Sequence, residues 1–204
     1  MIELLKNQFI SYLNSRKNVP IAFDEESVNI KTELVSQSLF DIIDKKSTIC
    51  QPLGQGSATY RNHFEKEIRF IDFENFINQL PENLCKEMKR CDFIAFDTKT
   101  NTFFILNELS QSATAKDKKN KALQQLHRAA FYFNETPAIN AFINTFQIKK
   151  CIFSNKHKLI SNTPNDIASA FSQIQNYLPD PIHLNYQPII KLGYELIETA
   201  IIEV

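Results

Sequence analysis

Glycine is scarce in this sequence, and its scarcity removes one common kind of ligand site. Only three glycines occur, and two of them, Gly54 and Gly56, stand close together. The Gly-x-Gly that they form lacks the rest of a dinucleotide-binding fingerprint, and no predicted strand precedes it. The segment from residue 47 to residue 57 also contains Pro52. We therefore interpret it as a loop.

Long apolar runs and paired cysteines are absent as well. No window approaches the roughly 18 uninterrupted apolar residues that indicate a transmembrane helix, and the N-terminus has no secretory apolar region. The four cysteines are widely spaced without a Cys-x-x-Cys pair, and the histidines lack zinc-site spacing. These features favour reduced thiols. We expect a soluble, cytoplasmic protein with no membrane partner and no zinc.

An excess of one charge is also missing, since 23 basic residues balance 23 acidic ones. Nucleic-acid-binding proteins usually carry a basic excess, so the balance weighs against that class. It does not exclude the class, because a local basic stripe can contact phosphates. Apolar residues make up 43% of the 204 residues, and phenylalanine occurs 17 times. That content supports a real core in one domain and argues against disorder.

The order of predicted elements is typical of an α/β fold with a mixed central sheet flanked by helices. We expect a single domain over residues 1–204, in which N-terminal helices (1–46) pack on a core (58–160), and residues 161–204 add a helix and a strand. The predicted helices cover residues 2–15, 27–46, 58–67, 115–133, 137–146 and 166–177. The predicted strands cover residues 68–77 and 148–154, with a hairpin over 91–110 between them and a final apolar run over 189–204.

Two acids lie near the two ends of the predicted hairpin. Asp92 opens its first apolar run, and Glu108 lies near the end of the second. Side chains alternate along a strand, so Phe104, Leu106 and Glu108 share one face. Pairing of the two runs would bring Asp92 and Glu108 to the same end of the sheet. Two carboxylates that converge there are hard-oxygen ligands suited to Mg²⁺, or to Mn²⁺.

A structural role is the alternative for both acids. Asp92 would then cap a turn, and Glu108 would end an exposed strand. Their apolar neighbours favour the functional interpretation, because charged groups flanked by Phe, Ile and Leu need a partner or a metal. Asp97, in contrast, stands in an Asp-Thr-Lys-Thr-Asn-Thr segment with the composition of a hairpin turn.

Residues 91–125 resemble the core of the PD-(D/E)xK nuclease superfamily, whose fold is called restriction-endonuclease-like. Its signature is an acid at the start of one strand, an acid-x-Lys element on the next, and a following helix. Asp92 matches the first acid and Glu108 the second, while Ser110 occupies the place of the lysine. The resemblance implies a Mg²⁺-dependent DNA endonuclease of restriction, repair or defence. It also implies that Asp92, Glu108 and the backbone carbonyl of Leu109 hold the metal.

The helix after the hairpin offers candidates for the missing lysine. Lys118 shares a helical face with Ala122 and Gln125, and Lys119 shares one with Leu126. Either lysine could point towards the sheet end. The resemblance makes Gln125 a further candidate site residue. A third acid often completes such sites, and the candidates are Glu33, Glu67 and, as the favourite, Glu65.

The same helix carries most of the local positive charge. Residues 113–128 contain one acid and five basic residues, which we predict to contact a phosphate backbone: Lys116, Lys118, Lys119, Lys121 and Arg128. The alternative is a solvated surface helix, because such helices are often rich in lysine.

Three functions follow from these patterns. The first is the metal-dependent nuclease, with DNA as its partner and a homodimer as the natural form for double-strand cleavage. The second is an inactive protein of the same fold that binds nucleic acid or protein. Ser110 and the neutral net charge favour it. The third is an interaction or immunity-like α/β domain with no nucleic-acid role. We favour the nuclease.

Overall fold

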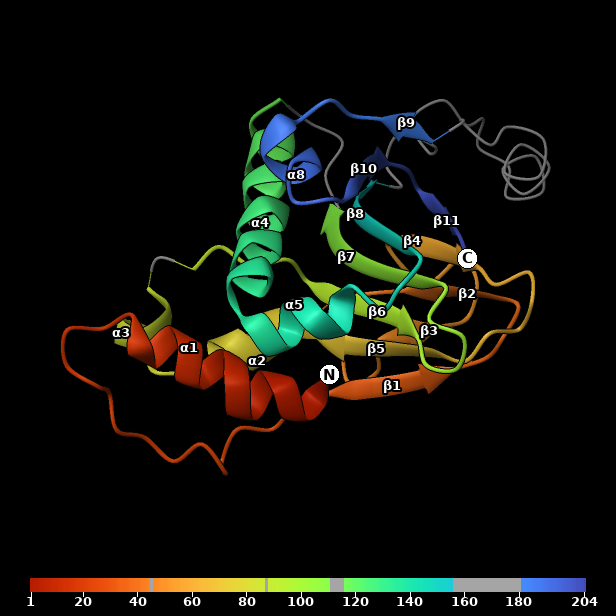
Figure 1. Ribbon diagram of the computed structural model, residues 1–204. Helices are drawn as coiled ribbons and strands as arrows, with labels where there is room; N and C mark the ends of the chain where they lie inside the picture. Colours follow the sequence, from red (N-terminus) through yellow and green to blue (C-terminus); the bar gives the residue numbers. More distant parts are fainter. Residues whose placement is uncertain (45, 87, 111–115, 156–180) are drawn as a thin grey trace.

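The computed structural model describes residues 1–44, 46–86, 88–110, 116–155 and 181–204 (Figure 1). Its larger sheet is mixed and has seven strands. In spatial order these are β1 (Thr32–Val35), β5 (Ile68–Asp72), β6 (Phe93–Asp97), β7 (Phe103–Ser110), β8 (Ile148–Asn155), β10 (Glu195–Glu198) and β9 (Ile182–His183). The prediction of a mixed sheet flanked by helices is confirmed.

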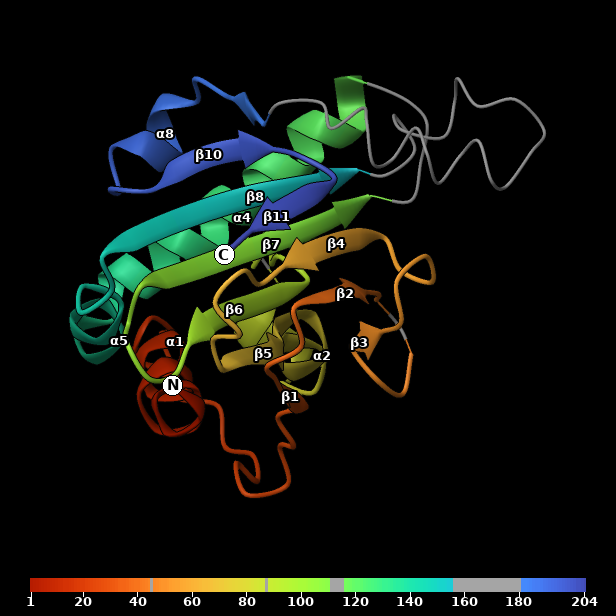
Figure 2. The ribbon, with the colours of Figure 1, turned by 90° about the vertical axis from the view of Figure 1, so that its right-hand side faces the viewer.

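A smaller sheet covers one face of the larger one (Figure 2). Its four strands are, in spatial order, β11 (Ile201–Glu203), β4 (Ala58–Arg61), β2 (Leu39–Ile42) and β3 (Cys50–Gln51). Phe40 and Tyr60 of this sheet pack on Phe70 of the larger sheet, with ring centroids 5.8 and 5.0 Å from that of Phe70. The core between the two sheets is therefore built largely from aromatic and β-branched side chains.

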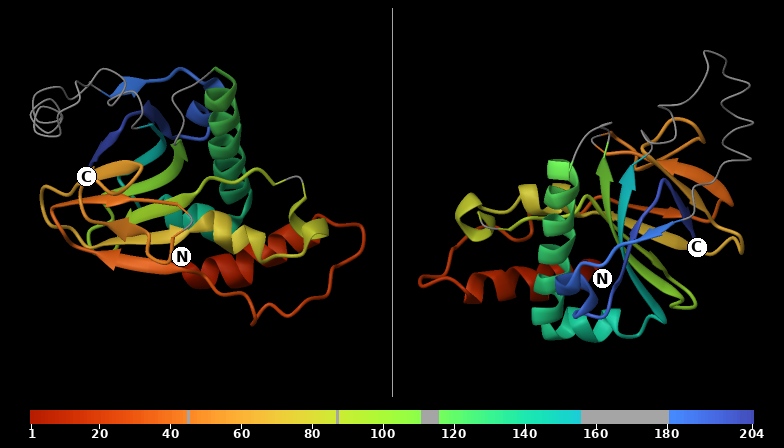
Figure 3. Two further views of the ribbon diagram at one scale, coloured as in Figure 1. Left: turned by 180° about the vertical axis from the view of Figure 1, so that it is seen from behind. Right: turned by 90° about the horizontal axis from the view of Figure 1, so that it is seen from above.

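Helices cover the opposite face of the larger sheet (Figures 1 and 3). They are a π-helix (Leu4–Phe9), α1 (Ile10–Ser15), α2 (Phe73–Asn78), α3 (Glu82–Cys85), α4 (Lys116–Glu135), α5 (Pro137–Ile143) and α8 (Gln187–Ile190). Phe9, Phe73 and Phe133 meet ring to ring and join the N-terminal helices, α2 and α4. No helix in the described part of the chain is both long enough and apolar enough to cross a membrane.

The central hairpin has the predicted alternation. Phe104 and Leu106 of β7 point to the helix side, whereas Phe103 and Ile105 point to the smaller sheet. β6 and β7 are antiparallel and are joined by a short turn. β7 and β8 are parallel, and α4 and α5 form the crossover connection that parallel strands need. The predicted turn at Asp97 is confirmed, since its carboxylate accepts hydrogen bonds from the backbone N–H groups of Lys99, Thr100 and Thr102.

Two predicted helices are wrong. Residues 27–46 form β1 and β2, and residues 58–67 contain β4. Each of these strands has four residues, too few to show a period of two, and pairing with a neighbouring strand decides their conformation. The predicted strand over residues 68–77 ends at Asp72, whose side chain caps α2 by accepting the Asn75 N–H at 2.9 Å. The predicted helix over residues 166–177 lies outside the described residues.

The loop between β3 and β4 folds tightly around one buried acid. Asp41 accepts hydrogen bonds from the backbone N–H groups of Gly54 and Gly56 at 2.8 and 2.9 Å and from the Thr59 hydroxyl at 2.7 Å. A Cβ atom added at Gly56 would lie 2.5 Å from both the Asp41 Cβ and the Ile42 carbonyl oxygen. The loop therefore needs glycine at this position for space.

We predict that Gly56→Ala lowers the free energy of unfolding by about 1–3 kcal/mol, because the added methyl group overpacks a buried contact. Urea denaturation followed by circular dichroism measures the change. Leu53→Ala is the control, since Leu53 is exposed in the same loop. Equal stability of Gly56→Ala and the wild type would contradict the prediction.

Candidate metal centre

Asp92 and Glu108 lie beside each other at one end of the larger sheet, as the hairpin predicted. Phe93 pairs with Asn107, so the next residues outward on the two strands are Asp92 and Glu108. Each of the two acids is only 7% exposed. The Asp92 carboxylate accepts a hydrogen bond from the Leu109 N–H at 2.7 Å. The main chain of β7 thus holds the Asp92 side chain against the strand that carries Glu108.

Two further acids complete the cluster, and sequence reasoning missed both. Asp44 follows β2, and Glu74 lies in the first turn of α2. One carboxylate oxygen from each of Asp44, Glu74 and Asp92 lies within 4.8 Å of the others. Asp92 is buried, and the other two are half-buried. These three residues could hold a metal ion, and carboxylate oxygens are the ligands that hard divalent cations prefer.

The start of α2 is fixed by the main chain next to the cluster. The Asp92 carbonyl oxygen accepts hydrogen bonds from the backbone N–H groups of Phe73 and Glu74, at 2.9 and 3.2 Å. These are N–H groups of the first helical turn, which have no partner within the helix. The same residue therefore offers a carboxylate to the cluster and fixes the position of a second acid, Glu74.

Glu108 is under electrostatic strain. Burial raises the pKa of Glu108 well above its usual value, and the charges of Asp92 and Glu74 raise it further. The charge of Lys121 and a hydrogen bond from the Asp92 backbone oppose this rise in the pKa. Among the described residues, the Glu108 Oε2 atom is buried and has no hydrogen-bond partner. A cation at this point would relieve both effects.

The two α4 lysines predicted to replace the missing motif lysine, Lys118 and Lys119, lie in different surroundings. The Lys119 Nζ atom lies 2.6 Å from the Glu198 carboxylate of β10, so its charge is already paired. Lys118 is exposed, as is Lys121. The charge of Lys121 nevertheless acts on Glu108 and lowers its pKa. Ser110 ends β7, half-buried, at the place where the superfamily signature has lysine.

The remaining predicted residues also have defined places. The Gln125 side chain donates a hydrogen bond to the Arg90 carbonyl at 2.9 Å and so holds α4 against the chain that leads to Asp92. Leu109 offers its N–H to Asp92 and packs with the core between the sheets. Arg128 is exposed on α4, and the side chain of Lys116 lies outside the described part of the structure.

The three glutamates considered as a third acid are not brought to the cluster. Glu65 is exposed in the connection between β4 and β5, and Glu67 contacts Thr98 and Lys99. Both precede Ile68, the first residue of β5, whereas Asp72 is its last residue, so they lie at the opposite end of this strand. The carboxylate of Glu33 instead accepts two backbone hydrogen bonds from β3 and the residue before it. The favoured residue, Glu65, is therefore replaced by Glu74 and Asp44.

Comparison with known proteins adds no family to this description, because no family model, no curated protein and no solved structure matches the chain.

Proposed function

We propose that this protein is a Mg²⁺-dependent nuclease with a restriction-endonuclease-like fold that acts on DNA. The observation that carries the proposal is the trio of Asp44, Glu74 and Asp92, whose ligand oxygens lie within 4.8 Å of one another, together with the neighbouring Glu108, whose buried Oε2 atom has no hydrogen-bond partner among the described residues. An acidic cluster alone is common on protein surfaces. A buried carboxylate oxygen without a hydrogen-bond partner beside the cluster is a much stronger indication of a cation.

The order of elements supports the same proposal. A helical N-terminus precedes β5, the β6–β7 hairpin follows, and α4 leads into β8 parallel to β7. From the hairpin onward this order agrees with the one expected of the superfamily, whereas β1–β4 stand between the N-terminal helices and β5, and α2 and α3 stand between β5 and the hairpin. Asp92 precedes the first strand of the hairpin, and Glu108 lies near the end of the second, as the signature requires.

The residues have distinct roles in the proposed reaction. Asp44, Glu74 and Asp92 would hold Mg²⁺, which supplies Lewis acidity at the scissile phosphate and lowers the pKa of a bound water. Glu108, beside them, would bind the cation through its unpartnered oxygen. Exposed basic residues on α4, namely Lys118, Lys121 and Arg128, would contact the phosphate backbone. Lys121 would bring the positive charge that Ser110 lacks.

One observation favours the inactive binding module as the second candidate. Lys119 is paired with the buried Glu198 and is not directed at the hairpin acids. With Ser110 in the lysine position, the site would then bind a metal without the charge that stabilises the transition state. Such a protein would retain metal binding and DNA or protein binding but would not cleave.

The nuclease is tested with supercoiled plasmid and single-stranded DNA in the presence of Mg²⁺ or Mn²⁺. We expect cleavage by the wild type and its loss in Glu74→Gln, which removes a ligand oxygen and keeps the shape of the side chain. Glu203→Gln is the matched control, because Glu203 is an exposed acid that pairs with Arg61 and His63. Cleavage should be unchanged in this control.

Each alternative outcome has a separate meaning. Metal binding without cleavage by the wild type would replace the nuclease with the inactive module. Equal cleavage by the wild type and Glu74→Gln would show that the cluster is not the active site. Absence of both metal binding and cleavage would contradict the proposed function.

A further inference from the structure

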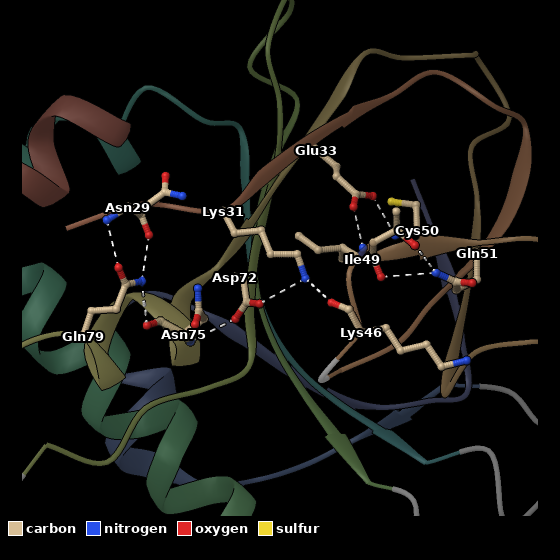
Figure 4. A network of polar contacts seen from close by, with 11 residues as sticks. Asn29, Lys31, Glu33, Lys46, Ile49, Cys50, Gln51, Asp72, Asn75 and Gln79 are labelled. Atoms are coloured by element: carbon tan, nitrogen blue, oxygen red, sulfur yellow. Dashed lines mark hydrogen bonds and ion pairs between the residues drawn. The ribbon is translucent and has the colours of Figure 1, made fainter. Parts of the chain in front are cut away.

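The segment that carries Asp44 is held in place by the side chains of Lys31, which directly precedes β1, and Glu33, which lies in β1, the edge strand of the larger sheet (Figure 4). This segment, described at residues 43–44 and 46–51 and called the 43–51 segment below, connects β2 with β3 and includes β3. The two strands share only two residue pairs, Asp41 with Gln51 and Ile42 with Cys50. Beyond them, the Ile43 N–H donates to the Ile49 carbonyl. So short a ladder leaves the position of Asp44 dependent on further contacts.

Glu33 of β1 supplies one of these contacts. Its two carboxylate oxygens accept hydrogen bonds from the Ile49 N–H at 2.5 Å and the Cys50 N–H at 2.8 Å. Because β1 belongs to the larger sheet and β3 to the smaller one, this bidentate contact ties the two sheets together. Hydrogen bonds that involve a charged group are stronger than neutral ones.

Lys31 supplies the second contact. Its Nζ atom donates to the Lys46 carbonyl at 2.5 Å and lies 3.5 Å from the Asp72 carboxylate. Asp72 caps α2, the helix that carries Glu74. Figure 4 shows Lys31 between Asp72 and Lys46. The Lys31 ammonium group thus contacts both the segment that carries Asp44 and the residue that caps the helix carrying Glu74.

We propose that Lys31 and Glu33 are positioning residues of the metal centre, which fix the 43–51 segment so that Asp44 reaches Glu74 and Asp92. The inference rests on the proposed function in that it takes the acid cluster to be a metal site. It assigns to Lys31 and Glu33, at the start of β1, control over whether Asp44 faces the cation together with Glu74 and Asp92. Supports behind metal ligands typically change metal affinity by about 10–100-fold when they are removed.

The first test is titration with Mn²⁺ followed by electron paramagnetic resonance. We expect Lys31→Met and Glu33→Gln each to bind Mn²⁺ about 10–100-fold more weakly than the wild type. Lys31→Arg should restore most of the affinity, because a guanidinium group can donate to both Asp72 and the Lys46 carbonyl. The matched control is Lys99→Met, which removes the Lys99–Glu67 pair at the opposite end of β5.

The second test reports on the segment without any metal. Cys50 is half-buried, and burial together with the Glu33 carboxylate raises the pKa of its thiol. Release of the segment should therefore speed alkylation of Cys50 by iodoacetamide, measured by mass spectrometry. Lys31→Met leaves Glu33 in place, so faster alkylation in this variant reports the movement of the segment. If Lys31→Met does not fold, Glu33→Gln and Lys31→Arg carry the comparison.

The outcomes separate the two proposals. Wild-type protein that binds no Mn²⁺ would overturn the proposed function. Wild-type protein that binds Mn²⁺ with the same affinity as Lys31→Met and Glu33→Gln would overturn the positioning role and leave the metal centre intact. Unchanged alkylation of Cys50 in both variants would overturn the positioning role as well.

Discussion

Asp92→Asn is expected to abolish metal-dependent DNA cleavage and to weaken Mn²⁺ binding by more than the roughly 100-fold upper limit typical of changes behind the ligands. Asp92 is the buried member of the three acids whose ligand oxygens lie within 4.8 Å of one another. Its charge also acts on Glu108. Asparagine keeps the shape of the side chain and an oxygen that can accept the Leu109 N–H. The change therefore removes a charge and a ligand with little disturbance of the hairpin.

Asp97→Asn is the matched control on the same strand. Asp97 is buried at the opposite end of β6, and burial alone would raise the pKa of its carboxyl group. Hydrogen bonds from Thr100, Lys99 and Thr102 outweigh burial and lower this pKa below its usual value of 3.8. Ionised Asp97 therefore stabilises the fold above pH 3.8, and this stabilisation is lost as the pH falls through the lowered pKa.

Asp92→Asn should change metal binding, whereas Asp97→Asn should change stability. At neutral pH, Asp97→Asn should lower the free energy of unfolding by about 1–3 kcal/mol, because turn donors lose their charged acceptor. Its affinity for Mn²⁺ should equal that of the wild type. Urea unfolding and Mn²⁺ titration of both proteins check this. Retention of Mn²⁺ binding by Asp92→Asn, or an equal loss of binding in Asp97→Asn, would remove Asp92 from the metal centre.

The hairpin acids could be predicted from the sequence because their meeting is local. A polar turn at residues 97–102 joins two apolar runs, so pairing of the runs brings Asp92 and Glu108 together with no knowledge of the remaining fold. Asp44 and Glu74 could not be found in this way. Asp44 follows a strand of the other sheet, and Glu74 depends on the cap at Asp72 that ends β5 early.

The fold was predictable where the elements are long. The helix over residues 116–135 and the strand over residues 148–155 are close to their expected bounds. The segment 27–46 was misread because Val35, Leu39 and Ile42 have the spacing of a helical face, although they belong to two short strands. Its strands are specified by pairing partners distant in the sequence, β5 for β1 and β4 for β2.

Partners that are distant in the sequence also explain why the α4 lysine that reaches the sheet, Lys119, does not reach the hairpin acids. Helical periodicity placed Lys118 or Lys119 near the sheet end, and Lys119 does lie close to the sheet. Its partner is Glu198 of β10, a strand from the C-terminal part of the chain. Periodicity can show which face of a helix a lysine shares, but it cannot show which carboxylate a distant strand places opposite to it.

Glu108→Gln is expected to raise the free energy of unfolding at neutral pH and to remove much of its dependence on pH in the absence of metal. Because the pKa of Glu108 is raised in the folded state, the unfolded chain ionises first as the pH rises above the usual value of 4.5. Folding stability is then lost by up to about 1.4 kcal/mol per pH unit until the raised pKa is passed. Glutamine does not ionise, so the variant should escape this loss.

Urea unfolding of wild type and Glu108→Gln at a series of pH values above 4.5 measures the difference. The two curves should converge below that pH and separate above it, with the wild type less stable. Saturating Mg²⁺ should bring the wild type back towards the variant, since a cation favours the ionised carboxylate and binds with release of a proton. Parallel curves would show that Glu108 ionises with its ordinary pKa. If the two curves separate but Mg²⁺ does not bring them together, Glu108 has a raised pKa but does not belong to the metal centre.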